Sequence, residues 1–311
     1  MSSSAADQQQ SSSLDAAHVQ SMYSWEANAE FWDNSIGQDG NQYWQLLQRP
    51  ALERMIPLPS PETRPGRRAL DLAAGNGVVS RWLAARGDLS VVVSTDGSEE
   101  MMRVSRKRYA AWSAGGSGSG SGDVAQMEFR RVDVTSEKDL EAIVSEFCAN
   151  ETGGDGDARF DIVTINMAIQ DISDLVPMAK ALPNLLKKGG IFVATLLHPV
   201  FFTSGANRHI QIIENDEHHE ATANIVRSKV VTRYLDVAPW RGVAMYGQPE
   251  QQYYFHRPLH ELFATFFRVG LAMDALEEPA FTDAERNADR IESHFNFTQL
   301  PAILAFRMRH L

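Results

Sequence analysis

Short apolar runs alternate with amphipathic stretches along most of the chain. Seven of these runs are predicted to form strands, at residues 68–73, 91–95, 127–132, 161–165, 191–197, 271–276 and 302–308. Between them, apolar residues recur at the spacing of helices that bury one face. Strands that alternate with helices are typical of a doubly wound α/β sheet, so we predict a seven-stranded sheet with helices on both faces.

Short polar signals mark the ends of the predicted helices. Ser98 is expected to cap a helix that reaches about Trp112, with two glutamates in its first turn. A second helix should start at Asp174 and end at Lys187–Gly189, where lysines precede a glycine. A third should run over residues 258–270. The helices therefore occupy the intervals between the strands.

The 311 residues divide into parts of different composition. Residues 1–20 begin with a stretch rich in serine and glutamine and are predicted to be a disordered tail, not a signal peptide. Residues 21–66 are dense in aromatic side chains and are predicted to form a helical cap. Residues 67–311 carry the predicted sheet. The glycine-serine run at 114–123 is expected to be a mobile linker without a functional role, and 150–157 a second loose connection.

One segment, at about 203–254, interrupts the alternation of strands and helices. It carries aromatic and charged side chains together and leaves the carboxyl end of the sheet, where open α/β folds bind their ligands. Long connections in compact domains commonly act as lids or binding loops. We therefore predict a lid over the substrate. The alternative is a surface insertion without a role in binding.

The turn after the first predicted strand, Asp71–Gly77, lets a ligand approach the backbone, because its glycines have no Cβ. The spacing of Gly75 and Gly77 alone also fits a dinucleotide site. Asp71 favours another ligand, since a carboxylate before the turn repels a pyrophosphate but suits an ammonium group. Asp96 ends the second strand, about where a carboxylate binds ribose hydroxyls. Both acids favour S-adenosylmethionine over NAD.

Further motifs follow the turn in a fixed order. The motifs are Asp71–Gly77, Thr95–Met101, Arg131–Val134, Phe160–Met167 and the His-Pro-x-Phe sequence His198–Phe201. This order resembles the class I S-adenosylmethionine-dependent methyltransferases, and within them the small-molecule enzymes of the ubiquinone and menaquinone type. The resemblance extends from about residue 23 to residue 309, with Ala73 at a position where many members have glycine. It implies a Rossmann-like, mostly parallel sheet with an antiparallel last strand.

The resemblance also implies which residues hold the cofactor. Asp71 would face the ammonium group of the cofactor, directly or through water, Asp96 its ribose, and Asp133 its adenine amino group. Asn166 and Met167 would line the other side. The full set is Asp71, Ala73, Gly75, Asn76, Gly77, Asp96, Gly97, Ser98, Asp133, Val134, Asn166 and Met167.

Residues near the ends of the fourth and fifth strands are candidates for the acceptor side. We predict His198 and Asp171 as catalytic residues, with His198 as a polar contact or base. A histidine that only positions the loop before Pro199 is the alternative. Predicted substrate contacts are Trp32, Trp44, Tyr254 and His256. The alternative for the two tryptophans is that they pack against the sheet edge. The alternative for His256 is that it caps a helix and has only a structural role.

Charge and cysteine content exclude several classes. A net charge of −11 and a pI near 5.3 argue against a nucleic-acid partner, since a phosphate backbone would be repelled. The single cysteine, Cys148, lies in an apolar helical pattern typical of a buried, inert thiol, so we expect a reducing, cytoplasmic location. No segment approaches the ~20 apolar residues of a membrane span. His218 and His219 are adjacent on a stretch that we expect to be extended, where neighbours point to opposite faces, so we predict no metal site.

The favoured function is methyl transfer from S-adenosylmethionine to an oxygen, nitrogen or sulfur atom of a small molecule, with secondary metabolism as the setting that the resemblance implies. A catalytically silent S-adenosylmethionine-binding protein is one alternative. A protein or RNA methyltransferase is another. RNA-modifying members often carry Asn/Asp-Pro-Pro-aromatic after the fourth strand, and Asn166–Ile169 lacks that sequence.

Overall fold

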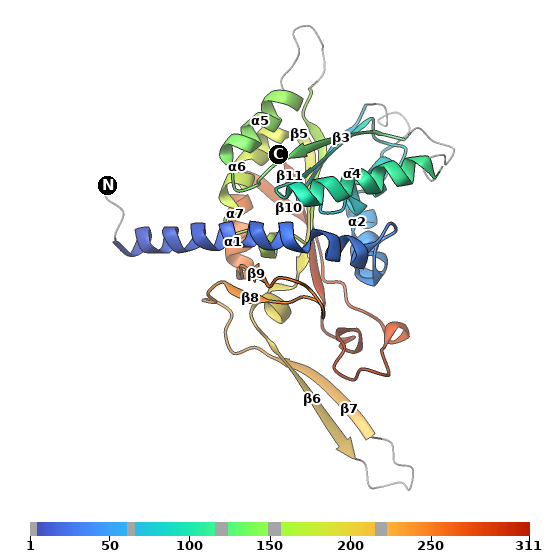
Figure 1. Ribbon diagram of the computed structural model, residues 1–311, viewed down its shortest axis with the longest axis vertical. Helices are drawn as coiled ribbons and strands as arrows, with labels where there is room; N and C mark the ends of the chain where they lie inside the picture. Colours follow the sequence, from blue (N-terminus) through green and yellow to red (C-terminus); the bar gives the residue numbers. More distant parts are fainter. Residues whose placement is uncertain (1–4, 61–65, 116–123, 149–156, 215–222) are drawn as a thin grey trace.

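A central sheet organises the computed structural model, which describes residues 5–60, 66–115, 124–148, 157–214 and 223–311 (Figure 1). The order of its strands is β10-β11-β5-β4-β1-β2-β3. These strands are β1 Arg68–Leu72, β2 Val91–Asp96, β3 Gln126–Arg131, β4 Phe160–Asn166, β5 Leu186–Leu197, β10 Leu271–Glu277 and β11 Ile303–His310. Strand β11 is antiparallel to both of its neighbours, and the remaining pairs are parallel. The predicted fold class is confirmed.

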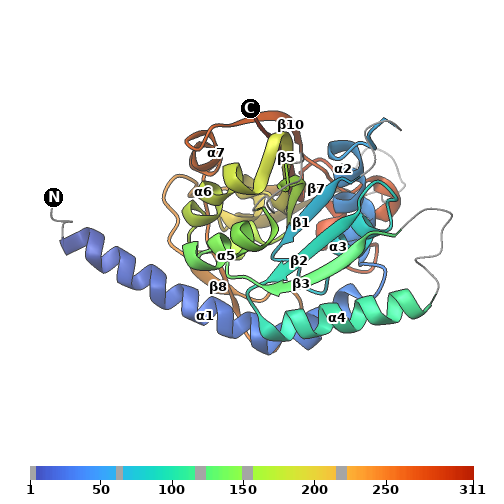
Figure 2. The same ribbon diagram turned by 90° about the horizontal axis from the view of Figure 1, so that it is seen from above.

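Both faces of the sheet are buried, because successive side chains of a strand point to opposite sides. Leu70 and Val93 belong to one apolar core, whereas their neighbours Ala69 and Val92 belong to the other. The first core also holds residues of α5 (Glu137–Phe147), α6 (Val176–Leu185) and α7 (Leu259–Phe267), and the second holds residues of α2 (Arg49–Met55) and α3 (Val78–Ala84) (Figure 2). The sheet is therefore the middle of three layers, as in doubly wound folds.

Helix α4 (Glu99–Ala114) begins as predicted. The Ser98 hydroxyl accepts a hydrogen bond from the backbone N–H of Met101 at 3.1 Å, which caps the helix. Helix α1 (Ala5–Ile36) lies along α4 (Figure 2), and the two share an apolar cluster that includes Ala29 and Val104. The amino-terminal cap consists of α1, a π-helical turn η1 (Trp44–Gln48) and α2.

The predicted tail needs correction. We expected residues 1–20 to be disordered, but the structure has a helix from Ala5 onward. Ser21, Ser24 and Asn28 of this helix donate hydrogen bonds to backbone oxygens of residues 171, 251 and 250, at 2.8–3.0 Å. These three residues lie in the predicted cap; within residues 1–20, His18 lies 2.8 Å from the Asp133 carboxylate. All of these contacts join segments far apart in the chain, so local composition does not reveal them.

The boundary between α6 and β5 also differs from the prediction. The helix spans residues 176–185, and Lys187–Gly189, which we expected to end it, already belongs to β5. Leu186 pairs with Phe160 of β4. Lys188 and Gly189 are exposed, and the pairing of β4 with β5 shifts register between Phe160 and Ile162. The lysines and the glycine therefore lie in an irregular first part of the strand, before its continuously buried part begins at Gly190.

The segment at 203–254 forms two small hairpins beyond the carboxyl ends of the parallel strands. Strands β6 (Asn207–Glu214) and β7 (Ala223–Val230) form a hairpin that projects from the domain (Figure 1). Strands β8 (Trp240–Gly242) and β9 (Gln252–Tyr254) pair beside α1 (Figure 1). The segment therefore lies at the edge of the sheet where ligands of this fold class bind.

Some sequence predictions fall on residues that the structure does not describe. These are most of the linker at 114–123, most of the connection at 150–157, and His218 and His219. Cys148, directly after α5, is half-buried, and burial raises the pKa of its thiol to about 11. Among the described helices, none combines the length and the apolar character of a membrane span.

Candidate active site

A cavity of about 1130 Å³ lies at the carboxyl ends of the parallel strands, between the sheet, the amino-terminal cap and the segment at 203–254. Of the residues predicted from sequence, its wall contains Trp32, Trp44, Asp71, Ala73, Gly75, Asn76, Asp96, Gly97, Asp133, Val134, Asn166, Met167, Asp171 and Tyr254. Gly77, Ser98, His198 and His256 are not part of this wall as the described residues define it. The cavity brings together predicted residues from six separate parts of the chain and is the candidate active site.

The turn after β1 presents bare backbone to this cavity. Ala73, Gly75 and Gly77 all have positive φ angles, of 49°, 56° and 76°. A Cβ at Gly77 would lie 2.4 Å from the Ser105 hydroxyl, so a glycine is required there for packing against α4. A Cβ at Gly75 would meet nothing within 4 Å. Gly75 therefore marks the open face over which a ligand has room.

Asp96 ties the turn to the start of α4. Its carboxylate accepts hydrogen bonds from the backbone N–H groups of Gly75 and Ser98, each at 2.9 Å. Burial raises the pKa of Asp96 to about 6, and these hydrogen bonds offset part of that rise. The carboxylate thus stands at the cavity wall with both of its oxygens fixed by backbone donors.

Asp71 lies beneath the turn. Its carboxylate accepts hydrogen bonds from the hydroxyls of Ser80 in α3, at 2.5 Å, and Thr164 in β4, at 2.8 Å. Burial raises the pKa of Asp71 to about 6, against the effect of the two hydroxyls. The side chain therefore joins β1, α3 and β4 at the cavity wall, and its predicted contact with an ammonium group stays a prediction.

Asp133, after β3, is covered by helix α1. His18 Nε2 lies 2.8 Å from its carboxylate, which also accepts hydrogen bonds from the backbone and hydroxyl of Thr135, at 2.9 and 2.7 Å. Although burial opposes ionisation, these hydrogen bonds lower the pKa of Asp133 to about 2. The contact with Asp133 in turn raises the pKa of His18. Helix α1 thus contacts the predicted adenine-binding acid through His18, a residue that the sequence analysis placed in the tail and did not predict at the site.

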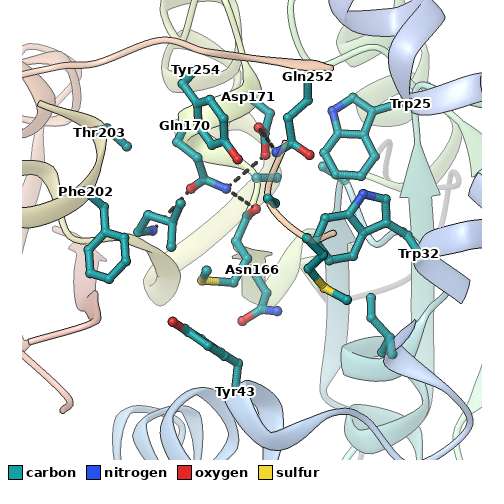
Figure 3. A pocket seen from close by; sticks show the side chains of 18 of the residues that line it. Trp25, Trp32, Tyr43, Asn166, Gln170, Asp171, Phe202, Thr203, Gln252 and Tyr254 are labelled. Atoms are coloured by element: carbon teal, nitrogen blue, oxygen red, sulfur yellow. Dashed lines mark hydrogen bonds between the residues drawn. The ribbon is translucent and has the colours of Figure 1, made fainter. Parts of the chain in front are cut away.

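The segment after β4 places a carboxyl group in the cavity wall, between Gln170 and Gln252 (Figure 3). Asp171 accepts hydrogen bonds from the side-chain amides of Gln170, at 2.9 Å, and Gln252, at 3.0 Å. Burial raises the pKa of Asp171 well above its usual value, although the two amides oppose that rise. The ring of Tyr254 reaches the same group and stacks on Trp240 at 4.4 Å (Figure 3). Sequence reasoning missed both glutamines, since Gln252 lies 81 positions from Asp171 in no motif.

Asn166 and Met167 form the adjoining wall. The amide of Asn166 donates to Gln48 of η1 at 3.0 Å and accepts from the hydroxyl of Thr195 in β5 at 2.5 Å. Met167 has a positive φ of 55°, which marks a sharp change of direction after β4. The amino-terminal cap is thereby attached to the ends of the central strands.

His198 and His256, which we predicted at the acceptor side, are occupied by loop contacts. His198 is 1% exposed, with Nε2 2.8 Å from Glu278 and Nδ1 accepting from the backbone of Val200 at 3.2 Å. Burial lowers the pKa of His198 and of His256. The two ring nitrogens of His256 contact Thr203 and the backbone of Tyr234, at 2.9 and 2.6 Å. This geometry matches the alternative of positioning histidines.

Three buried polar atoms among the cavity-lining residues lack a hydrogen-bond partner within the described part of the chain. One is Nδ1 of His294. The other two are Nε1 of Trp32, which lies across the cavity from Phe202 in Figure 3, and Oδ1 of Asn76 in the turn. Buried polar groups in folded proteins are almost always paired. A polar ligand held above Gly75 would supply one acceptor and one donor at this place, so the residues present fit such a ligand.

No family model matches the chain, and no curated protein matches it. Solved structures do match. An S-adenosylmethionine-dependent methyltransferase from Mesorhizobium loti has 22% identity and a TM-score of 0.55, over 88% of this chain and 100% of that one. A putative S-adenosylmethionine-dependent methyltransferase from Listeria monocytogenes has 17% identity and a TM-score of 0.54, over 86% and 97%.

A third match comes from a complex between the Trm112 methyltransferase activator of Haloferax volcanii and the putative methyltransferase, with 15% identity and a TM-score of 0.50, over 93% of this chain and 96% of that one. At these identities the similarity is one of fold. The chain therefore has the Rossmann-like fold of S-adenosylmethionine-dependent methyltransferases.

Proposed function

We propose that this chain binds S-adenosylmethionine in the cavity and transfers its methyl group to a small-molecule acceptor. The observation that carries the proposal is the open face above Gly75, in a cavity whose wall also holds the half-buried carboxylates of Asp96 and Asp133 and the unpartnered Oδ1 of Asn76. A nucleoside with a cationic side chain matches this combination of bare backbone, acids and a free acceptor atom.

The cofactor's place follows from the chemistry of the wall. Asp96 would accept from the ribose hydroxyls, and Asp133 with Val134 would take the adenine. Asp71 and the turn would hold the methionyl part. The remaining contacts would come from Ala73, Gly97, Asn166 and Met167, which line the cavity. When bound there, the cofactor supplies an electrophilic methyl group on a positively charged sulfur.

The residues across the cavity would orient the acceptor and exclude water, which is the main contribution that an enzyme makes to a direct displacement. Trp32 and Tyr254 would contact the acceptor, and Trp44 would support them, since it also packs edge-on against Trp82 at 6.1 Å. Asp171 would take the proton of an O–H or N–H acceptor on a carboxylate oxygen. Its raised pKa brings it closer to the range of an effective base.

His198 is proposed as a positioning residue. Its nitrogens hold the start of the π-helical turn η4 (Pro199–Thr203), whose Phe202 and Thr203 line the cavity. The histidine would thereby act on the acceptor through the loop that it orients.

Two measurements on the full chain test the proposal. Isothermal titration with S-adenosylhomocysteine should show saturable binding at one site. Transfer of labelled methyl from S-adenosylmethionine to a panel of phenols, carboxylic acids, amines and thiols should then identify at least one acceptor. Absence of cofactor binding would refute the proposal, whereas binding without transfer to any acceptor would favour a silent binding protein.

A further inference from the structure

Positive side chains gather at one part of the cavity wall. Arg208 of β6 and Lys229 of β7 are paired in register, and both line the cavity together with Arg290 and His294. Lys229 and His294 lie against the ring of Phe202, and Arg208 is close enough to Tyr43 to act on its pKa. Figure 3 shows Phe202 on the opposite side of the cavity from Trp25 and Trp32. In a chain of net charge −11, a cationic wall inside a cavity calls for an explanation.

The contacts of Lys229 leave its charge uncompensated. Its Nζ donates a hydrogen bond to the backbone oxygen of Phe201 at 2.6 Å and lies 3.3 Å from the centre of the Phe202 ring. A carbonyl and an aromatic face attract a cation but do not neutralise it. Among the described residues, no carboxylate forms an ion pair with Lys229.

Arg208 is in a similar position. It donates to the backbone oxygen of Glu292 at 2.6 Å, while the carboxylate of Glu292 pairs with Arg290 at 2.9 Å. The carboxylate of Glu292 is therefore paired with Arg290, although Arg208 is close enough to help lower its pKa. In the described ranges neither Arg208 nor Lys229 forms an ion pair with a carboxylate. This pair, together with His294, is called the cationic wall below.

The neighbourhood shows the effect of this charge. Burial, together with the nearby Arg208, lowers the pKa of Lys229 to about 7. Burial and the same two cations lower the pKa of His294 to about 4. Nδ1 of His294 is buried and has no hydrogen-bond partner in the described part of the chain. The neutral imidazole is thus able to donate one further hydrogen bond, provided that Nδ1 carries the proton.

Flat apolar groups surround the cationic wall. The ring of Phe202 lies 4.8 Å from that of His294, and Tyr43 lies edge-on to Phe295 at 6.1 Å. Burial raises the pKa of Tyr43 to about 12, so its hydroxyl remains a donor at neutral pH. The wall therefore combines two cations and two neutral donors with an aromatic slot.

We propose that Lys229 and Arg208, with His294 beside them, form a subsite for an oxyanion of the methyl acceptor. The acceptor is then a small molecule in which a carboxylate or a phosphate is attached to a flat apolar body. The inference rests on the proposed function, because it takes this part of the cavity as the acceptor pocket. The oxyanion serves as an anchor, and the methylated atom lies toward Asp171 and Tyr254, nearer to the ends of β4 and β1.

The test uses the full chain saturated with S-adenosylhomocysteine and two matched pairs of probes. These are 2-naphthoate against 2-naphthamide, for a carboxylate, and 2-naphthyl phosphate against 2-naphthol, for a phosphate. Titration should show that at least one anion binds about tenfold or more tightly than its neutral partner, since charge-assisted hydrogen bonds are roughly twice as strong as neutral ones. The pair with the larger ratio identifies the anionic group.

Variants locate the effect. Lys229→Gln and Arg208→Gln should each lower the affinity for the preferred anion about tenfold, with no change for the neutral probe or for S-adenosylhomocysteine. Arg227→Gln is the matched control, because it removes the same charge from the same hairpin but lies outside the cavity wall and contacts the backbone of Ile291. It should leave every affinity unchanged.

The outcomes separate the two proposals. If neither anion binds more tightly than its neutral partner while S-adenosylhomocysteine binds, the oxyanion subsite is refuted and the proposed function stands. An equal loss in Arg227→Gln would likewise refute it, since the effect would then be one of overall charge. If S-adenosylhomocysteine does not bind the unaltered chain, the proposed function itself fails. The comparison of probes on the unaltered chain needs no variant, so it holds even where a variant folds poorly.

Discussion

Gly75 illustrates how one residue in the turn can serve the ligand and not the fold. Its φ of 56° strains any side chain, yet a Cβ there would meet no other atom within 4 Å. Gly87, after α3, shares this description, with a φ of 74° and open space around it, but it is exposed and lies outside the cavity wall. A substitution at Gly87 therefore strains the backbone as one at Gly75 does, but only the substitution at Gly75 enters the cavity.

Gly75→Val should abolish binding of S-adenosylhomocysteine, because the added side chain enters the space above the turn. Gly87→Val should bind normally. Both variants should lose a similar amount of stability, about 1–2 kcal/mol, from the left-handed backbone. Titration and thermal unfolding of the two variants check this. Normal binding by Gly75→Val would show that the cofactor does not approach the turn.

Asp171 allows a second test at the residue scale. Asp171→Asn preserves the shape of the side chain and removes its ability to take a proton. Turnover should fall by about 10²–10⁴-fold, and the rise of rate with pH that reports its ionisation should disappear. Affinity for S-adenosylhomocysteine should not change.

Asp174→Asn is the control for this substitution, since Asp174 is an exposed acid in the same loop that only accepts from the backbone of Val176 at 2.8 Å. It should retain full turnover. Equal turnover in Asp171→Asn would mean that the acceptor loses its proton elsewhere.

At the scale of elements, helix α1 acts as a cover on the cavity. Its polar side chains reach three different places: His18 contacts Asp133, Ser21 donates to the backbone of Asp171, and Glu26 accepts from the first two N–H groups of α4. The last contact places a carboxylate at the positive end of a helix, which is favourable. Helix α1 is thus attached to the domain at three separate places around the cavity.

The contact between His18 and Asp133 makes the cover sensitive to pH. The folded pKa of His18 is raised above 6.5, so its contribution is complete below about pH 6.5 and is lost as the pH rises through the raised value. The folded pKa of Asp133 is lowered from 3.8 to about 2, so its contribution is lost only as the pH falls through about 2. The contact is therefore at full strength between about pH 4 and 6.5.

Hydrogen exchange should accordingly show that residues 14–24 of α1 lose protection between pH 6 and pH 9, after correction for the intrinsic rate. His18→Ala should remove this dependence and give low protection at both pH values. Residues 99–110 of α4 provide the internal reference. Equal protection of α1 at both pH values in the unaltered chain would show that the contact does not hold the helix.

At the scale of the whole molecule, the cavity lies at the carboxyl ends of the parallel strands, and the described residues at the opposite edge of the sheet, at their amino ends, take no part in it. Every cofactor residue proposed above lies at the carboxyl end of a parallel strand or directly after it. The run at 114–123 instead joins the end of α4 to the start of β3, at the amino edge of the sheet. Changes at that edge should therefore not reach the chemistry.

Removal of residues 118–121 tests this separation. The shortened chain should bind S-adenosylhomocysteine and turn over acceptor within about twofold of the unaltered chain, because surface connections tolerate changes of length. Steady-state kinetics and titration are the measurements. A large fall in turnover with an unchanged melting temperature would place the run near the site.

Much of the molecule followed from local pattern alone. The short apolar runs predicted the seven strands of the central sheet, because a strand buried on both faces requires a continuous apolar sequence. The turn after β1 and the helix cap at Ser98 could also be predicted from the sequence, because a positive φ and a helix cap depend on one or two adjacent residues. These features are decided within a few positions of the chain.

Tertiary structure decided which side chains meet. Gln252 reaches Asp171 only because β9 lies beside the segment after β4. Lys229 faces Arg208 through the register of the β6–β7 hairpin, and both reach the cavity because the base of that hairpin lies at its wall. His198 follows a strand end, as the pattern indicated, yet its ring turns toward Glu278 and away from the cavity. The direction of a side chain and its partners depend on long-range packing, and a glutamine or lysine outside a motif carries no local signal of either.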